Sequence, residues 1–286
     1  MTVTDQAPVV VGVDGSDQAL TAVQAATREA AWRGRDLHIV HAFIWPLMHV
    51  NVGASDAVPD GGLRHDAERI LAQAAGAAAR TDAAVTVTTE LVTGAASGVL
   101  LRAARRASLL VLGDRGLGGL GGLLLGSVAV YVSSHVDTPM LVVRGQERRP
   151  GPVVLGMDGS HAAAAAVEAA FVEAEQRGCD LLAVRVCHEP QAGIPSVARS
   201  YAADAAEECS SSQLCHPDVA VRQEVRVGPV TRTLVGLSEQ AQLMVVGSRG
   251  CGGFTGLLRG SVSQQLLHHA ACPVLVVRHA RAPVRA

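Results

Sequence analysis

The stretch that decides the fold is PVVVGVDGS at residues 8–16, which returns as PVVLGMDGS at residues 152–160. In each copy a continuous run of β-branched and aliphatic residues stops at an aspartate, a glycine and a serine. A short run that is apolar without alternation is typical of a strand buried on both faces of a parallel sheet. The repeat therefore predicts two tandem domains that each open on such a strand.

The repeat continues to the end of each half. TPMLVVR, which ends at Arg144, returns as CPVLVVR, which ends at Arg278. The second half is ten residues shorter, and the difference falls between residues 47 and 93. The segment RGQERRPGP at residues 144–152 is charged and contains proline and glycine, as is typical of a linker. We therefore expect domains at residues 1–146 and 151–286.

Further strands and helices alternate along each half. Ser16 is expected to cap a helix that Gly34 closes, since apolar residues recur between them at helical spacing. The other expected strands of the first half are LHIVHAF at 37–43, AVTVTTEL at 84–91, LLVLG at 109–113 and PMLVVR at 139–144. The second half repeats all five strands. Strands that alternate with helices predict an α/β fold of two tandem, doubly wound, five-stranded parallel sheets, which is a Rossmann-like architecture.

Composition excludes several classes of protein. All 24 residues in the combined lysine and arginine count are arginines, which removes the P-loop lysine and Schiff-base chemistry. A net charge of −2 and an aromatic content of 2% argue against nucleic acid and anionic membrane as partners. The start shows no secretory signal, and residues 116–134 are uncharged but too rich in glycine for a membrane span. We expect a cytoplasmic protein in which residues 116–134 form a loop that enters a helix.

The six cysteines all lie in the second half and include no CxxC pair. Reduced thiols are the simplest interpretation. Cys209, Cys215 and His216 would be one set of metal ligands, but no second ligand pair stands at zinc-site spacing, so no metal site is predicted.

The most informative motif follows the fourth expected strand. GDRGLGGLGGLLLGSVA begins at Gly113, GSRGCGGFTGLLRGSVS begins at Gly247, and both contain GxxG, nine residues and GS. Glycines at a strand exit let backbone N–H groups turn inward, and the N-terminus of the next helix favours an anion. Ser127 and Ser261 would cap that helix or donate to a phosphate oxygen. A tight turn alone does not require the same nine-residue spacer twice, so the motif predicts a phosphate site.

The aspartates after the first strands, Asp14 and Asp158, lie where a doubly wound sheet binds ligands, at the carboxyl ends of its strands. Turn or cap aspartates are the alternative interpretation. These motifs together with the closing TPMLVVR strand resemble the universal stress protein family in its tandem form, over nearly the whole chain. The resemblance implies the fold of the adenine nucleotide alpha hydrolase group and ATP binding, with one nucleotide per domain.

The same resemblance assigns roles to residues. Asp14 and Asp158 would contact ribose, the glycine motifs would hold phosphates, and the backbone near Ala42 and Val186 would meet adenine. Arginines and Mg²⁺ would help to neutralise the phosphates. The complete candidate set is Gly12, Asp14, Ala42, Gly113, Arg115, Gly116, Gly126, Ser127 and Val128 in the first half, and Gly156, Asp158, Val186, Gly247, Arg249, Gly250, Gly260, Ser261, Val262 and Ser263 in the second.

The two halves differ inside the motif. Asp114 stands where the second half has Ser248, Ala129 matches Ser263, and Leu125 matches Arg259. Because an aspartate repels phosphate unless a cation intervenes, we expect the second site to bind ATP more tightly.

Several alternatives stand beside a nucleotide-binding regulator of stress, growth arrest or dormancy. Gly116, Gly118 and Gly121 match GxGxxG, but after the fourth strand, and Thr255 breaks the second copy, which argues against an NAD-dependent oxidoreductase. A slow ATP hydrolase or phosphotransfer enzyme would need a base, and no histidine recurs at the same place in both halves. A scaffold that has lost its nucleotide is the third class. The apolar last strands are expected to pair, as an intrachain pseudo-dimer or a homodimer, and a protein partner is not identified by sequence.

Overall fold

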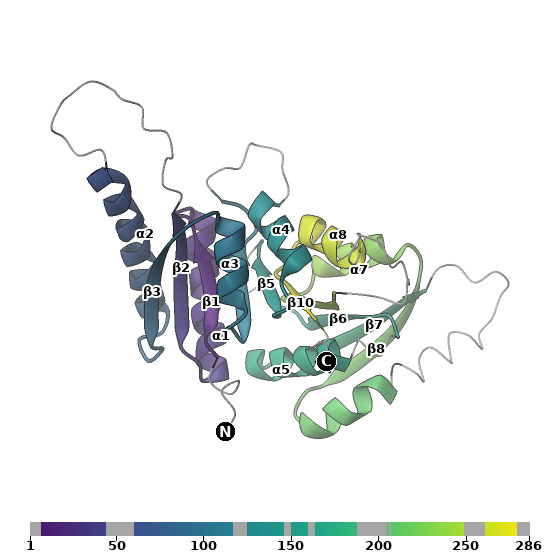
Figure 1. Ribbon diagram of the computed structural model, residues 1–286. Coiled ribbons are helices and arrows are strands. Elements are labelled where there is room, and N and C mark those ends of the chain that lie inside the picture. The colour runs from purple at the N-terminus through teal and green to yellow at the C-terminus, as the bar shows by residue number, and fades with distance from the viewer. Residues whose placement is uncertain are drawn as a thin grey trace, which may run out of the picture. The chain divides into compact units, whose positions relative to one another are not determined.

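The computed structural model divides into two compact units, Met1–Thr138 and Pro139–Ala286 (Figure 1). It describes residues 7–43, 60–116, 125–145, 150–159, 164–187, 205, 207–248 and 261–278. No helix within these ranges is long and apolar enough to cross a membrane.

The first unit alternates strands and helices. Its elements are β1 (Val9–Val13), α1 (Asp17–Arg33), β2 (Leu37–Phe43), α2 (Asp60–Thr81), β3 (Val87–Thr93), α3 (Ala96–Ala104), β4 (Leu109–Gly113) and α4 (Ser127–His135). The strands lie in the order β3-β2-β1-β4, and all three pairs are parallel. Helix α1 packs against α2, and α3 packs against α4 (Figure 1). The chain leaves β1 toward β2 and returns at β4 on its other side, which places a switch in strand order between β1 and β4.

The second unit repeats this arrangement with two additional strands, β5 and β10. Its elements are β5 (Met140–Val143), β6 (Val153–Met157), α5 (Ala164–Arg177), β7 (Leu181–Cys187), β8 (Val221–Val227), α7 (Val230–Ser238), β9 (Leu243–Gly247), α8 (Ser261–His269) and β10 (Val274–Val277). The order is β5-β10-β9-β6-β7-β8, and every pair is parallel except β5 with β10, where Leu141 lies opposite Leu275. The α/β architecture and the pairing of the two last strands are confirmed. Strand β5, which ends the first repeat in sequence, lies in the second compact unit.

The residues expected to begin and end α1 are also confirmed. The Ser16 side chain accepts a hydrogen bond from the Ala19 N–H, and Gly34 closes the helix with φ +59°. Strand β3 was predicted too early, at residues 84–91. The Asp82 carboxylate accepts a hydrogen bond from the Ala84 N–H at 2.9 Å, and this local turn delays the strand to Val87.

Apolar strands and alanine-rich helices form the core of each unit. Every residue of β5 and β10 is buried, and among the residues that the structure describes Phe171 is the largest fully buried side chain. A buried glutamate recurs in the two repeats: Glu29 in α1 and Glu173 in α5 are each 1% exposed. Arg33 and Arg177, one helical turn later, pair with them at 3.1 and 2.8 Å. The sequence repeat therefore includes a buried ion pair.

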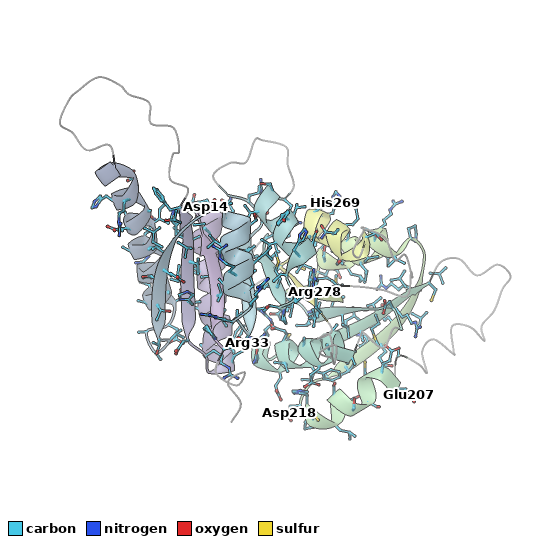
Figure 2. All side chains as sticks on the ribbon, in the orientation of Figure 1. Asp14, Arg33, Glu207, Asp218, His269 and Arg278 are labelled. Atoms are coloured by element: carbon cyan, nitrogen blue, oxygen red, sulfur yellow. The ribbon has the colours of Figure 1, made fainter. Side chains whose placement is uncertain are left out.

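In the second unit, the helical residues 207–215 are held to α5 by a histidine. The His216 ring lies 2.9 Å from Glu175 Oε2 and 3.3 Å from Glu168 Oε1, and it stacks on Phe171. Figure 2 labels Glu207 at the start of this segment and Asp218 just after its end. Burial alone lowers the pKa of His216, but hydrogen bonds to the Glu168 and Glu175 carboxylates outweigh it, so the pKa lies above the ordinary 6.5.

These contacts of His216 predict that the free energy of unfolding depends on pH. A raised folded-state pKa stabilises the protein fully below the unfolded value of 6.5, and the contribution disappears as pH rises through the folded value. Replacing His216 with glutamine should lower the free energy of unfolding by about 1–2 kcal/mol at mildly acidic pH and by much less in alkaline solution. Urea unfolding of both proteins across this pH range measures the difference. A loss that grows toward alkaline pH would contradict these charged contacts.

The five cysteines within the described residues are free thiols, and Cys251 lies outside those residues. Cys209 is completely buried, and this burial raises the pKa of its thiol to about 11. The described residues contain no group of three metal-ligating side chains. Cys209 therefore serves packing, since its thiol stays protonated at neutral pH.

Candidate functional site

The candidate site of the first unit lies at the carboxyl ends of β1 and β4. These strands pair in parallel, with Val11 opposite Val111, so Asp14 and Gly113 leave the same edge of the sheet. Figure 2 shows Asp14 at this edge, with Arg33 near the other end of α1. The predicted positions at the ends of these two strands are confirmed, and they coincide with the switch in strand order.

Asp14 connects the two loops at this edge. Its Oδ1 accepts hydrogen bonds from the Ser16 N–H at 3.0 Å and from the Ser16 hydroxyl at 2.7 Å. Its Oδ2 lies against Gly116, where a Cβ would overlap the carboxylate oxygen. The structure therefore brings together Asp14 and Gly116, which the sequence assigned to different motifs of one site.

The second loop ends at the uncapped N-terminus of α4. Gly126 takes the N-cap position and has no side chain to cap the helix, while its own N–H donates to the Asp114 carbonyl at 2.8 Å. The first helical N–H groups, at Ser127 and Val128, point out of the helix without intrahelical acceptors. Ser127 is exposed and lies inside the first turn of α4, whereas Gly126 occupies the N-cap position. The expectation that Ser127 caps α4 is therefore wrong. An N-terminus of this kind favours a phosphate.

Two of the candidate glycines have packing roles instead. A Cβ at Gly12 would meet Leu100 and Leu112 at 2.7 and 2.8 Å, and one at Gly156 would meet Val246 at 3.1 Å. Both positions lie inside their strands and face apolar side chains. Gly113 lies at the edge but is also closely packed, with Gln18 O 3.0 Å from its Cβ position.

An acidic and a basic side chain adjoin the glycine-bearing loop after β4. Asp114 is buried, and its Oδ2 lies 3.5 Å from the Arg115 Nε, whose side chain is 56% exposed. Arg115 therefore offsets part of the negative charge of Asp114. More than half of the Arg115 side chain is exposed, so it is accessible to a ligand.

The end of β2 places Ala42 beside a buried histidine. His41 Nδ1 lies 2.7 Å from the Val13 carbonyl, which can only accept, so this nitrogen carries the proton. His41 thus joins the end of β2 to the residue before Asp14. It positions the loop that carries Asp14.

The second unit has a matching edge that the structure describes in part. Asp158 follows β6, Gly247 ends β9, and the Ser248 N–H donates to the Val277 carbonyl at 2.8 Å. Val186 lies in β7, Ser261 and Val262 begin α8, and Ser263 is buried there. Arg249, Gly250 and Gly260 lie outside the described residues.

Sequence reasoning missed Arg185. It lies opposite Met157 as His41 lies opposite Val13, so the two residues are equivalent in the repeats. The Arg185 guanidinium covers Gly159, where a Cβ would overlap it, and lies 3.8 Å from Glu208 Oε1. Its side chain is 12% exposed. The alignment of the repeats contained this substitution of an arginine for a histidine, but only the structure shows it beside the loop that carries Asp158.

Two doubly wound repeats with a glycine-bearing loop at the carboxyl edge place the chain among tandem α/β proteins of Rossmann-like architecture. The family model described as "Universal stress protein family" matches residues 7–144 and again residues 151–278. The chain belongs to the universal stress protein family.

Similar proteins support this assignment over the full length. A universal stress protein of Mycolicibacterium smegmatis is 34% identical over 286 residues, covering 94% of this chain and 96% of its own. One from Mycobacterium tuberculosis is 35% identical over 289 residues, with the same coverage. The crystal structure of a universal stress protein from Archaeoglobus fulgidus matches with a TM-score of 0.71 at 18% identity, covering 98% of this chain and 99% of that one. This last likeness concerns the fold.

Proposed function

We propose that the chain binds ATP at the carboxyl edge of each repeat and acts as a regulatory or sensing protein. The proposal rests on one observation: Asp14 contacts Gly116 beside the uncapped N-terminus of α4. A carboxylate, a backbone without a side chain and a helix N-terminus gather within one edge of the sheet.

These groups fit the parts of a nucleoside triphosphate. Asp14 would accept hydrogen bonds from ribose hydroxyls, while the N–H groups of the Gly116 loop and of Ser127 and Val128 would hold phosphate oxygens. Arg115 supplies a guanidinium in place of the lysine that this chain lacks. Mg²⁺, when bound with ATP, would neutralise phosphate charge.

The arrangement favours retention of ATP over its turnover. Hydrolysis would need a base near the terminal phosphate. His41 is the buried histidine of this edge, and its Nδ1–H is engaged by the Val13 carbonyl. A slow ATP hydrolase or phosphotransfer enzyme remains the second candidate, supported by the Asp114 carboxylate beside the phosphate loop.

The direct test is the nucleotide content of protein purified without added nucleotide. Native mass spectrometry, followed by denaturation and chromatography of the released small molecules, should find two adenine nucleotides per chain. Protein that carries none and binds none at millimolar ATP would contradict the proposal and favour a scaffold. Release of ADP on the timescale of minutes would favour the hydrolase.

A regulatory role requires that ATP alters what the chain presents to a partner. Hydrogen exchange with and without ATP should show slower exchange in the loop after β4 and in the first turn of α4, with α2 as an internal reference. Unchanged exchange at these segments in ATP-saturated protein would contradict a sensing role.

A further inference from the structure

The first unit contains a groove between its sheet and α3. Its volume is about 630 Å³, and it is bounded by β1, β2 and β3 on one side and by α3 on the other. It runs from Pro8, which precedes β1, to Val92 near the carboxyl end of β3, and Asp14 does not line it. None of the candidate nucleotide-site residues lines the groove.

One wall of the groove is strongly basic. Arg102, Arg105 and Arg106 lie three and four residues apart on α3 and just past its end, so they share one face. All three side chains are exposed, and within the described residues none of them forms an ion pair. Neighbouring like charges at this spacing repel one another, which costs a few tenths of a kcal/mol per pair.

The opposite wall supplies little compensation. His38 Nε2 lies 3.0 Å from Glu90 Oε2, and His38 Nδ1 lies 2.9 Å from the Thr88 hydroxyl. Glu90 is the acidic residue that lines the groove, and it is already engaged by His38. Three guanidinium groups therefore face one carboxylate.

The second repeat shows that the fold does not require these arginines. Helix α7 spans the residues equivalent to α3 and has no basic residue in its last turn. The positions equivalent to Arg102, Arg105 and Arg106 are Gly236, Glu239 and Gln240. Glu224, which matches Glu90, pairs with Arg226 at 2.7 Å. Cations interact favourably with the C-terminus of a helix, but α7 forms without them. This interaction alone therefore does not explain the three arginines.

Apolar surface accompanies the charge. Val92 and Ala103 are half-buried in the groove, and the nearly buried side chains of Val10, Val40 and Val99 close its floor. The volume falls within the range of about 300–1,000 Å³ that is usual for small-molecule sites. Guanidinium groups bind carboxylates and phosphates through paired N–H donors.

We propose that this groove binds a small amphipathic anion, with a phosphate or carboxylate head on the α3 arginines and a short apolar body against Val92 and Ala103. The first repeat then carries two sites of different chemistry that share no lining residue. The second repeat lacks these arginines at the equivalent positions.

Octyl phosphate is a suitable probe, measured by calorimetry on the full chain saturated with ATP. The wild type should bind it, and the double variant Arg105→Glu/Arg106→Gln, which introduces the residues of the second repeat, should bind at least tenfold more weakly. The double variant Arg64→Glu/Arg69→Gln on α2 makes the same change in charge within the same unit and should bind within twofold of the wild type. Thermal unfolding of each variant confirms that it is folded.

Octanoate and inorganic phosphate separate the contributions of head and body. Octanoate binding that is lost in the same variant supports the shared anionic chemistry. Inorganic phosphate that binds as tightly as octyl phosphate would overturn the amphipathic ligand. Absence of octyl phosphate binding to the wild type, equal losses in both double variants, or displacement of octyl phosphate by ATP would overturn the site.

Discussion

Replacing Gly116 with alanine is expected to weaken ATP binding by the first repeat at least tenfold, with the fold retained. A Cβ at this position would overlap Asp14 Oδ2, so the carboxylate could no longer contact the proposed phosphate loop. Both residues lie on loops at the edge of the sheet, whereas the core strands β1 and β4 are unchanged. A tenfold loss corresponds to about 1.4 kcal/mol, roughly the net contribution of one hydrogen bond.

Isothermal titration with ATP measures this effect, and Gly236→Ala is the matched control. Gly236 is an exposed glycine inside α7, and a Cβ there would meet nothing within 4 Å. Alanine at this position should leave ATP binding unchanged and raise stability by about 0.5–1 kcal/mol, as usual inside a helix. ATP titrations of Gly116→Ala that match those of Gly236→Ala would contradict the proposed site.

The equivalent change in the second repeat, Gly250→Ala, tests whether the two sites differ. Asp114 adjoins the loop of the first repeat, where the second has Ser248, so we expect tighter binding in the second repeat. Arg115 reduces this difference by its contact with Asp114. The larger loss of binding should come from Gly250→Ala; a larger loss from Gly116→Ala would reverse the expected order.

Much of the fold could be predicted because apolar runs alone specify buried parallel strands. β2 and β4 begin and end where their runs do, since both faces of each are covered. β3 could not be placed to the residue, because its burial is incomplete and the Asp82 turn competes with the start of the strand. The pairing of β5 with β10 followed from their apolar character, but its register required the structure.

The sequence predicted the candidate site where residues that recur in both repeats come together at the carboxyl edge of the sheet. Asp14 and Gly116 do so, whereas Gly12 is retained in both repeats because α3 and β4 leave no room for a Cβ. Comparison of the repeats points to residues that both halves share. Arg185 was missed because it differs from its equivalent in the first half. Repetition thus identifies positions under constraint without separating ligand contacts from packing.

The repeated Glu29–Arg33 and Glu173–Arg177 pairs illustrate a constraint that is structural. Glu173 is 1% exposed, and its Oε2 accepts hydrogen bonds from Arg177 Nε at 3.1 Å and Nη2 at 2.8 Å. Removing the cation of a buried pair leaves a carboxylate that is costly to keep out of water. Replacing Arg177 with methionine is therefore expected to lower the free energy of unfolding by about 3–5 kcal/mol, the largest single effect on stability that we anticipate.

Urea unfolding measures this loss, and Arg69→Met is the control. Arg69 pairs with Asp66 at 3.0 Å, but both side chains are more than half exposed, so its replacement should cost less than about 1 kcal/mol. The double variant Glu173→Met/Arg177→Met removes the buried charge together with its partner and should recover much of the loss, because apolar side chains of similar volume suit the same space. An Arg177→Met variant no less stable than Arg69→Met would show that the buried carboxylate is sufficiently stabilised by its other neighbours. ATP affinity should be unchanged in all of these variants, since Glu173 and Arg177 lie in the last turns of α5, at the far end from Asp158.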